Sequence, residues 1–337
     1  MHTVEEQFTV IHCPRKKTVR LIMIVFFAFI IPLALCFGCV AFILSQTNRT
    51  IPKLDKRFEI ELKDHDELND LLPQGNGFVY LVNGNEIRIV GENGENLGKF
   101  RYKSKVTAIG NNDLSYETNA DLTVALEDQT IHLYQYNDGK YEETDSVSVP
   151  GIVTHMYCGS SDMCSYVLED GRAFRMSLAH TDTDGYLVDR YLSSELIHDD
   201  LKLVSDYYGV GKDNSIIHLY DDAKMTPIEE EIIGLDGDIA YTRNQAYTIS
   251  FYSAQEDAYV TEIAVFEDGQ FYACRDDYMY RKDGQFYYTG ILSGEWRGKG
   301  IPESRDARLK LPESDRYFVI DRGVVCYRDH TIVCYWV

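Results

Sequence analysis

Apolar positions fall into one long uninterrupted run near the start of the chain and many short runs after it. The long run, Leu21 to Leu44, contains no charged residue in 24 positions. As an α-helix rising about 1.5 Å per residue it would be about 36 Å long, enough to cross the roughly 30 Å hydrocarbon core of a bilayer. The pattern therefore predicts one transmembrane helix. The alternatives are a cleaved signal peptide, whose apolar region is usually about 7–15 residues long, and a buried core helix.

Basic residues crowd the N-terminal side of this run, at Arg15, Lys16, Lys17 and Arg20. Such a cluster favours a cytoplasmic N-terminus, and a long C-terminal domain is translocated largely regardless of its own charge. We therefore expect a single-pass membrane protein whose C-terminal domain is extracellular or lumenal. Its predicted parts are a cytoplasmic tail (residues 1–20), the transmembrane helix (21–44), a polar stalk (45–56) and an extracytoplasmic domain (57–337).

Beyond the stalk, short β-type runs alternate with turns. An apolar strand, a polar turn and a second strand recur around Gly84, Asp128, Asp170, Asp213, Asp268 and Asp321, at spacings of 44, 42, 43, 55 and 53 residues. Asn-Gly and Asp-Gly pairs between alternating apolar residues are strong hairpin signals. A repeat of about 40–50 residues is typical of a β-propeller blade.

We therefore predict an all-β fold, a propeller of six or seven blades, preceded by the transmembrane helix. Seven blades are expected if the segment TRNQAYTISFY, near residue 250, forms a blade of its own. The strand RFEIELK is expected to pair with the end of the chain near Thr331–Val337 and so close the ring. Acid-rich DHDELNDLL (residues 64–72) suggests one short helix. A β-sandwich is the alternative, but it gives no reason for the recurring unit.

The first unit, FVYLVNGNEIRIVGENGENLGKFRYKS, resembles the blade of quinoprotein-type propellers. Gly84 and Gly94 occupy the places of its two glycine-containing turns, and Phe100 that of the aromatic residue on the following strand. The Trp-Asp signature of WD-type blades is absent, since Trp296 and Trp336 are the only tryptophans. This resemblance to the quinoprotein-like and WD-like β-propeller superfamily implies a fold class and no bound quinone.

Acidic residues outnumber basic ones by 54 to 33, which gives a formal net charge of −21. The first 45 residues hold two acids and four bases, so the rest of the chain carries 52 acids and 29 bases, a net charge of −23. Proteins bind nucleic acid by neutralising phosphates with Lys and Arg. The charge balance therefore argues against nucleic acid as a partner of the domain.

Five cysteines lie beyond the apolar run, and two pairs have spacings that suit hairpins. Cys158 faces Cys164 if their turn centres on Ser161, and Cys326 faces Cys334 if the turn centres on His330. Directly opposed residues on antiparallel strands lie within disulfide range, whereas a one-residue slip would separate them. We predict both disulfides, with reduced and buried cysteines as the alternative.

The segment HTDTDGYLVD partly matches a calcium loop, in which alternating carboxylates converge around a glycine turn. Asp182 and Asp184 match its middle and Asp189 lies one place from a later ligand, but His180 replaces the first acid. A Ca²⁺ site is one interpretation and a plain acidic turn is the favoured one. His155 with Cys158 and Cys164 also forms a partial zinc pattern, with which disulfide formation competes.

Residues 294–316 form an insertion with six bases and five acids in an otherwise acidic domain. Long loops on a rigid scaffold commonly carry binding function, and Trp and Arg are enriched at interface hot spots. The candidate binding residues are Trp296, Arg297, Lys299, Arg305 and Arg308. A tolerated, charge-balanced surface insertion is the alternative.

No motif for nucleophilic catalysis, zinc-peptidase chemistry or phosphate binding occurs in the chain. We therefore expect a binding or scaffold module for a protein or surface partner rather than an enzyme, with no cofactor other than the calcium alternative. One rival is a membrane-anchored glycan hydrolase with carboxylates at the central mouth of the propeller. Another is an assembly or signalling subunit whose tail contacts a cytoplasmic partner.

Overall fold

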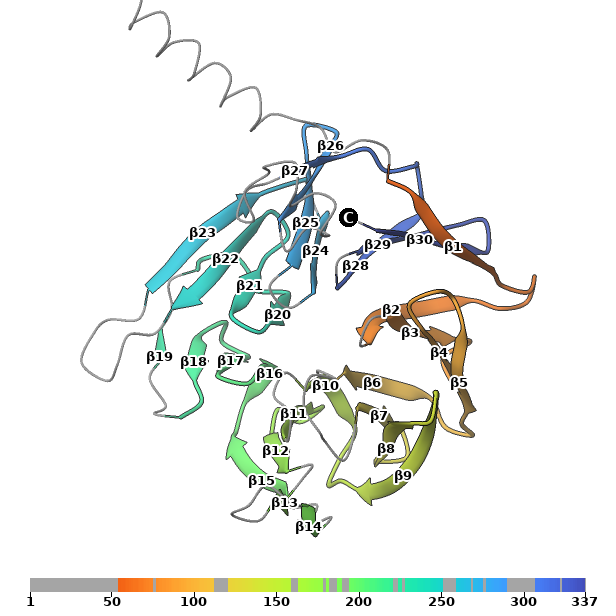
Figure 1. Ribbon diagram of the computed structural model, residues 1–337. Helices are drawn as coiled ribbons and strands as arrows, with labels where there is room; N and C mark the ends of the chain where they lie inside the picture. The colour runs from red at the N-terminus through yellow and green to blue at the C-terminus, as the bar shows by residue number, and fades with distance from the viewer. Residues whose placement is uncertain are drawn as a thin grey trace, which may run out of the picture. The chain divides into compact units, whose positions relative to one another are not determined.

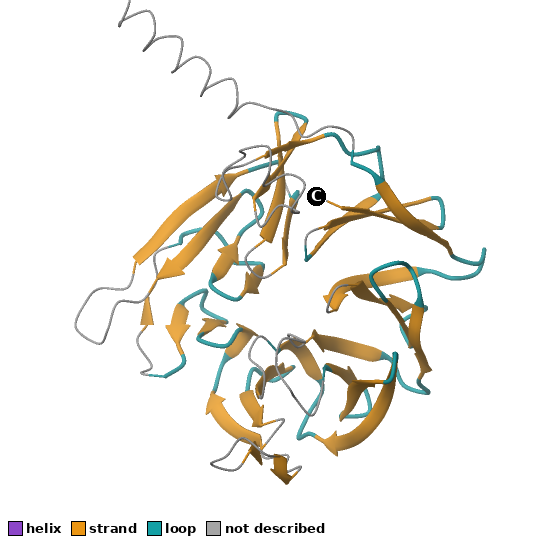
Figure 2. Ribbon diagram, viewed as in Figure 1, coloured by secondary structure: helices purple, strands orange, loops and turns teal. Residues whose placement is uncertain are grey.

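β-strands make up all of the regular structure that the computed structural model describes (Figure 2). The described residues are 54–74, 77–111, 121–158, 163–177, 180–181, 187–189, 194–220, 224–225, 228–250, 259–267, 269–274, 277–289, 307–321 and 323–336. Within these ranges there is no helix of the length and apolarity that crossing a membrane requires. The apolar run Leu21 to Leu44, on which the transmembrane prediction depends, lies outside them.

The strands of the described ranges form seven four-stranded antiparallel sheets, which follow one another around a centre as propeller blades (Figure 1). Blade 1 consists of β2 (Leu68–Gln74), β3 (Gly77–Val82), β4 (Glu86–Val90) and β5 (Asn96–Arg101). Blade 2 consists of β6 (Val106–Asn111), β7 (Leu122–Leu126), β8 (Thr130–Asn137) and β9 (Lys140–Ser148). Blade 3 consists of β10 (Val153–Tyr157), β11 (Met163–Leu168), β12 (Ala173–Ser177) and β15 (Ser194–His198), with the hairpin β13 (His180–Thr181) and β14 (Leu187–Asp189) between its last two strands.

The second half of the ring repeats this order. Blade 4 consists of β16 (Leu201–Val204), β17 (Tyr208–Gly211), β18 (Ile216–His218) and β19 (Lys224–Met225). Blade 5 consists of β20 (Gly234–Asp236), β21 (Ile239–Tyr241), β22 (Gln245–Ser250) and β23 (Tyr259–Val265). Blade 6 consists of β24 (Phe271–Cys274), β25 (Asp277–Lys282), β26 (Gln285–Thr289) and β27 (Ala307–Leu309). Blade 7 consists of β28 (Arg316–Ile320), β29 (Gly323–Arg328) and β30 (Thr331–Trp336), completed by β1 (Lys56–Glu61).

The two ends of the domain close the ring in one sheet. β1 pairs antiparallel with β30, so that Phe58 lies opposite Cys334 and Glu61 opposite Thr331. This pairing confirms the predicted closure, which removes an exposed sheet edge from each end of the chain. Leu54, which the sequence placed in the stalk, is buried among residues of blades 6 and 7.

Four of the six predicted hairpins join the second and third strands of a blade. These are the hairpins around Gly84, Asp128, Asp170 and Asp213. The segment TRNQAYTISFY contains all of β22 and the turn before it, so it belongs to a separate blade, as the seven-blade prediction required. The spacing of 55 residues between Asp213 and Asp268 therefore contains one additional blade, blade 5.

The hairpin predicted around Asp268 is wrong. β23 and β24, on either side of it, pair with β22 and β25 and so belong to different blades. The blade 6 hairpin instead turns at Asp283 and Gly284, whose φ angles of 52° and 72° suit a tight two-residue turn. An Asp-Gly pair between apolar runs signals a turn, but it does not distinguish a turn within a blade from a connection between blades.

The helix suggested for residues 64–72 is also wrong. Lys63 to Glu67 form a turn, and β2 begins at Leu68 and pairs with β3 along its length. Pairing with β3 buries Leu68 and Leu71, and this packing outweighs the local helix preference of the acidic residues.

The core lies between the blades rather than inside each one. Every cluster of buried apolar side chains in the described ranges combines residues of two neighbouring blades. Ile87 and Ile89 of blade 1, for example, pack with Leu122 and Tyr134 of blade 2. Because each sheet buries both faces against its neighbours, a blade cannot bury its apolar surface alone.

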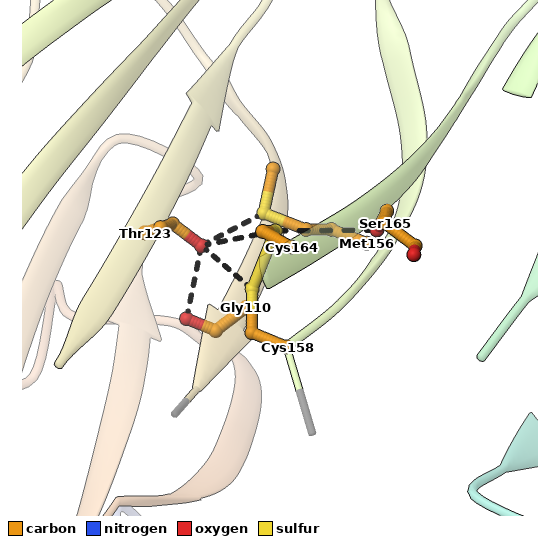
Figure 3. The surroundings of a disulfide bond; sticks show 6 residues. All are labelled: Gly110, Thr123, Met156, Cys158, Cys164 and Ser165. Atoms are coloured by element: carbon orange, nitrogen blue, oxygen red, sulfur yellow. Dashed lines mark hydrogen bonds between the residues drawn. A yellow bond between two sulfur atoms is a disulfide. The ribbon is translucent and has the colours of Figure 1, made fainter. Parts of the chain in front are cut away.

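A disulfide links Cys158 and Cys164 in blade 3 (Figure 3). Tyr157 pairs with Ser165, the register that the sequence predicted, and the two cysteine Cα atoms are 4.3 Å apart. The Thr123 hydroxyl lies beside them and donates a hydrogen bond to the carbonyl oxygen of Gly110 at 3.2 Å. The structure confirms this pair as a disulfide.

The predicted Cys326–Cys334 disulfide is wrong, because both thiols are free and buried. The turn consists of two residues, Asp329 and His330, with φ angles of 48° and 60°. This tight turn places Cys326 opposite Val333 and Cys334 opposite Val325, one residue out of the predicted register. Successive strand positions face opposite sides of a sheet, so the two cysteines join different core clusters.

Candidate binding site in the central cavity

The first strand of each blade lies nearest the centre of the ring (Figure 1). A cavity of about 300 Å³ is lined there by residues of β2, β6, β10, β20, β24 and β28, together with Tyr241 of β21. Six of the seven blades therefore contribute their first strand to one site. A volume near 300 Å³ is at the lower end of the range of small-ligand pockets.

Tyr241 reaches the cavity because it lies opposite a glycine. Gly234 of β20 pairs with Tyr241 of β21, and a Cβ atom on Gly234 would be only 1.9 Å from the Tyr241 ring carbon Cζ. The Tyr241 side chain thus lies across β20 at Gly234, where that strand has no side chain. Burial, together with the charges of Asp236 and Asp70, raises the pKa of Tyr241 to about 12, so its hydroxyl is protonated at neutral pH.

Two carboxylates line the cavity, Asp70 from β2 and Asp236 from β20. Asp70 is exposed, so water reaches the cavity, and its Oδ1 accepts a hydrogen bond from the backbone N–H of Leu71 at 2.8 Å. Although water reaches the carboxyl group, the surrounding cavity walls partly desolvate it and so raise the pKa of Asp70, while that hydrogen bond and the charge of Arg316 oppose the increase. Both carboxylates lie close enough to Tyr241 to influence its ionisation.

His155 of β10 contributes a neutral imidazole. The backbone N–H of Val204 donates to its Nδ1 at 3.3 Å, which makes Nδ1 an acceptor and places the proton on Nε2. Burial lowers the pKa of His155 to about 4. At neutral pH this residue therefore adds a hydrogen-bond donor to the cavity wall and no charge.

Aromatic rings form much of the remaining wall. Tyr157, Phe271, Tyr272 and Phe318 line the cavity together with Tyr241, whose ring centroid is 5.0 Å from that of Phe271. The hydroxyl of Tyr272 donates to Oε1 of Gln270 at 3.1 Å. Among the described residues that line this cavity there is no lysine or arginine. The site thus combines aromatic surface with two carboxylates and a neutral histidine.

Asp66 and Glu86 form a second group of carboxylates, at blade 1, and this group is paired with Arg88. The guanidinium NH2 of Arg88 contacts Oδ2 of Asp66 at 2.7 Å and Oε1 of Glu86 at 2.6 Å. Both acids are buried, and Lys99 Nζ also lies 3.1 Å from Glu86. Burial opposes ionisation of the two acids, but Arg88 outweighs it, so the pKa values of Asp66 and Glu86 are lowered.

Most of the binding residues predicted in the insertion lie outside the described ranges: Trp296, Arg297, Lys299 and Arg305. Arg308 is described, half-buried in β27 opposite Tyr287. The end of the insertion helps to line a second cavity of about 640 Å³ with residues such as Arg281, Gln285 and Tyr317. Arg308 is not one of its lining residues.

The predicted calcium ligands Asp182 and Asp184 also lie outside the described ranges. Asp189 is in β14, where its backbone pairs with that of His180. Among the residues that the structure describes, no group of three or more His, Cys, Asp or Glu side chains could hold a metal ion. Cys158 and Cys164 of the partial zinc pattern form the disulfide that competes with it.

The sequence singled out none of Asp70, Asp236 and Tyr241. The signal that could have found them is position, since all three lie on the first two strands of a blade. Using that signal requires the correct blade boundaries, which the sequence left open around blade 5.

No protein-family model and no curated protein matches this chain. Among solved structures, the β-propeller domain of Cps50 (Swd1) from Myceliophteria thermophila is 11% identical, with 84% of this chain and 99% of that one covered and a TM-score of 0.55. The C-terminal WD40 domain of Sif2 is 12% identical, with 82% and 83% covered and a TM-score of 0.48. BamB from Moraxella catarrhalis is 10% identical, with 84% and 100% covered and a TM-score of 0.46. The likeness to the Cps50 domain supports the expected β-propeller, and at this identity it concerns the fold alone.

Proposed function

We propose that this chain is a single-pass membrane protein whose propeller binds a protein partner on the extracellular or lumenal side of the membrane. The central cavity supports the binding role, because it lies where six blades meet and combines aromatic rings with the side chains of Asp70 and Asp236. A seven-bladed ring also holds such a site rigidly, since each blade packs against two others. The uncharged run Leu21 to Leu44 and the basic residues before it support the anchor and its orientation.

Capture from solubilised membranes tests the binding role. The tagged full-length chain is compared with Ala273→Tyr, which adds a large side chain to the cavity wall at β24, and with Arg101→Met, an exposed position on β5 away from the cavity. We expect a protein that the unchanged chain and Arg101→Met both capture and that Ala273→Tyr loses. Unaltered far-ultraviolet circular dichroism of Ala273→Tyr is the folding control. Capture of nothing above background would contradict the binding role.

Carbonate extraction and intact mass spectrometry test the anchor. The full-length chain should remain in the membrane pellet, whereas deletion of residues 21–44 should release it. A signal peptide would instead give a shortened chain in the soluble fraction. That mass would overturn the membrane proposal and leave the binding proposal intact.

A glycan hydrolase is a second candidate, favoured by the two carboxylates in one cavity. Glycoside hydrolysis commonly uses one carboxylic acid as proton donor and a second carboxylate as base or nucleophile. Asp70 fits the donor, because its pKa is raised as that role requires. Hydrolysis of chromogenic glycosides by the purified chain, lost in both Asp70→Asn and Asp236→Asn, would establish this activity, and its absence over a panel of glycosides would dismiss it.

A further inference from the structure

Three sulfur atoms of blade 3 lie together against blade 2 (Figure 3). The Thr123 hydroxyl oxygen is 2.9 Å from Sδ of Met156 and 3.3 Å from Sγ of Cys158. The same oxygen is 3.8 Å from Sγ of Cys164. Gly110 makes room for this group, because a Cβ atom there would be 2.4 Å from the Cys158 sulfur and 2.8 Å from the Met156 sulfur. The disulfide is therefore part of a cluster that also contains a thioether.

Strand geometry explains which side chains meet in this cluster. Met156 and Cys158 are two positions apart along β10 and its continuation, so they lie on the same face of the sheet. The register of β10 with β11 places Cys164 opposite Cys158. His155 lies on the other face, where its Nδ1 accepts a hydrogen bond from the backbone N–H of Val204. The third group beside the two cysteines is thus the thioether and not the imidazole.

The cluster is buried but borders the central cavity. The side chains of Cys164, Cys158 and Met156 are only 0%, 2% and 7% exposed, so water does not compete with them for a bound ion. Met156 and Cys158 also line the cavity. Because the cavity contains the exposed residue Asp70, it offers an ion a route from the solvent to the sulfur atoms.

We propose that reduction of the Cys158–Cys164 disulfide converts this cluster into a binding site for a Cu⁺ ion. Thiolate and thioether groups are soft ligands, which favour Cu⁺ over ions that prefer oxygen ligands. The thiolates of Cys158 and Cys164 and the thioether of Met156 are the three ligands, and the Thr123 hydroxyl lies beside them. All of these groups belong to the chain itself, so the site does not depend on the proposed protein partner.

The redox state of the cysteines controls the site, because a disulfide offers no thiolate. A dithiol supplies two electrons and two protons, the S–S bond breaks, and Cys158 and Cys164 become thiols while the dithiol closes to its own disulfide. Cu⁺ then replaces the two thiol protons, which are released to water, because metal ions bind the thiolate form. The ion and its two thiolates together carry a charge of −1.

Competition with bicinchoninate, a coloured chelator of Cu⁺, tests the proposal on the full-length chain in nanodiscs. One sample stays oxidised, and another is reduced with dithiothreitol and desalted without oxygen. Intact mass after alkylation in denaturant shows whether the disulfide has opened. We expect the reduced chain to take about one more Cu⁺ per chain from the chelator than the oxidised chain does. Equal uptake by the two samples, with the disulfide open in the second, would overturn the proposal.

Met156→Leu locates the ion without removing either cysteine. The exchange conserves volume, so its cost in stability should stay below about 1.5 kcal/mol. It should weaken Cu⁺ binding by the reduced chain about 10-fold or more, since even loss of an outer-shell partner costs about 10- to 100-fold. Met279→Leu, at a buried methionine of β25 in blade 6, is the matched control and should change nothing. Equal binding by these two variants would overturn the assignment of Met156.

X-ray absorption at the copper edge identifies the ligand atoms of the loaded chain. We expect sulfur neighbours alone, and a nitrogen neighbour would overturn the all-sulfur site in favour of His155. Cys158→Ser removes one thiolate and should abolish the additional Cu⁺ uptake. Additional uptake that persists in Cys158→Ser would place the ion at other cysteines of the chain and overturn the proposal.

Discussion

Asp66 and Asp70 lie four positions apart in one acid-rich segment, yet their surroundings have opposite charge balance. Asp66 is buried beside Arg88, which also contacts Glu86. Asp70 lines a central cavity, and the described residues of its wall include Asp236 but no lysine or arginine. The segment divides between these sites because β2 begins at Leu68, between the two acids, and carries Asp70 to the centre of the ring.

The comparison teaches how to separate structural from functional carboxylates in a strongly acidic domain. Burial opposes ionisation in both places, but Arg88 reverses that effect at Asp66, whereas the pKa of Asp70 remains raised. Arg88 pairs with Asp66 and Glu86 inside the protein, which is typical of a buried charged group with a structural role. Asp70 instead lines the cavity that we propose as the binding site.

Arg88→Met should produce the largest loss of stability. The substitution keeps much of the side-chain volume but removes the guanidinium that pairs with buried Asp66 and shares Glu86 with Lys99. Breaking a buried ion pair in this way costs about 3–5 kcal/mol. Urea denaturation at neutral pH measures the loss. Arg101→Met is the matched control, because Arg101 lies 3.8 Å from the same Glu86 but is exposed, and we expect its cost to be below about 1 kcal/mol. Equal losses for the two variants would mean that burial of the pair is unimportant.

Gly234→Ala should cause an intermediate loss of stability, through side-chain packing beside the central cavity. Its Cβ would collide with the Tyr241 ring, and overpacking of this kind costs about 1–3 kcal/mol. Adding Tyr241→Ala should remove the collision, so the double variant should lose less stability than the two single variants combined. Gly151→Ala is the control, because its nearest contact is a terminal carbon of Leu168 at 3.2 Å. Additive losses would refute the packing of Tyr241 over Gly234.

The pH dependence of stability should differ in sign between the two acids. Asp66 has a lowered pKa, so its stabilisation is present above its unfolded value near 3.8 and is lost as pH falls through its folded pKa. Asp70 has a raised pKa, so its charge costs the folded state stability at neutral pH, and that cost disappears as pH falls through its folded pKa toward 3.8.

Denaturation of Asp66→Asn and Asp70→Asn between pH 7 and pH 3 measures this difference. At pH 7, Asp66→Asn should be less stable than the unchanged chain, and Asp70→Asn should be equally or more stable, by less than about 1 kcal/mol. Both differences should shrink on acidification. A large loss of stability in Asp70→Asn at neutral pH would place Asp70 with the structural acids.

The sequence predicted the blade repeat well where hairpin turns are regular and less well where they are not. Four of its hairpins, from Gly84 to Asp213, have the predicted place in a blade, and the closing pair of β1 with β30 is confirmed. It misread Asp268, because a turn between blades has the same residues as a turn within one. It misread residues 64–72, because the pairing that makes β2 a strand comes from β3.

The two predicted disulfides show that the sequence pattern also does not specify strand register to within one residue. Both pairs suit a hairpin disulfide by spacing, but Asp329 and His330 form a two-residue turn that shifts the register and separates Cys326 from Cys334. At Cys158 the predicted register is the one that forms. Turn conformation decides which cysteine faces which, and spacing alone does not specify it.

The sequence by itself determined the all-β class, the repeat, the closure of the ring and the acidity of the domain. These properties follow from alternation and composition, which are local. Only the tertiary structure placed Asp70, Asp236, His155 and Tyr241 in one cavity, because these residues come from blades 1, 3 and 5, which are far apart in the chain. Closing seven blades into a ring brings their first strands to a common centre, and no local pattern records which side chains meet there.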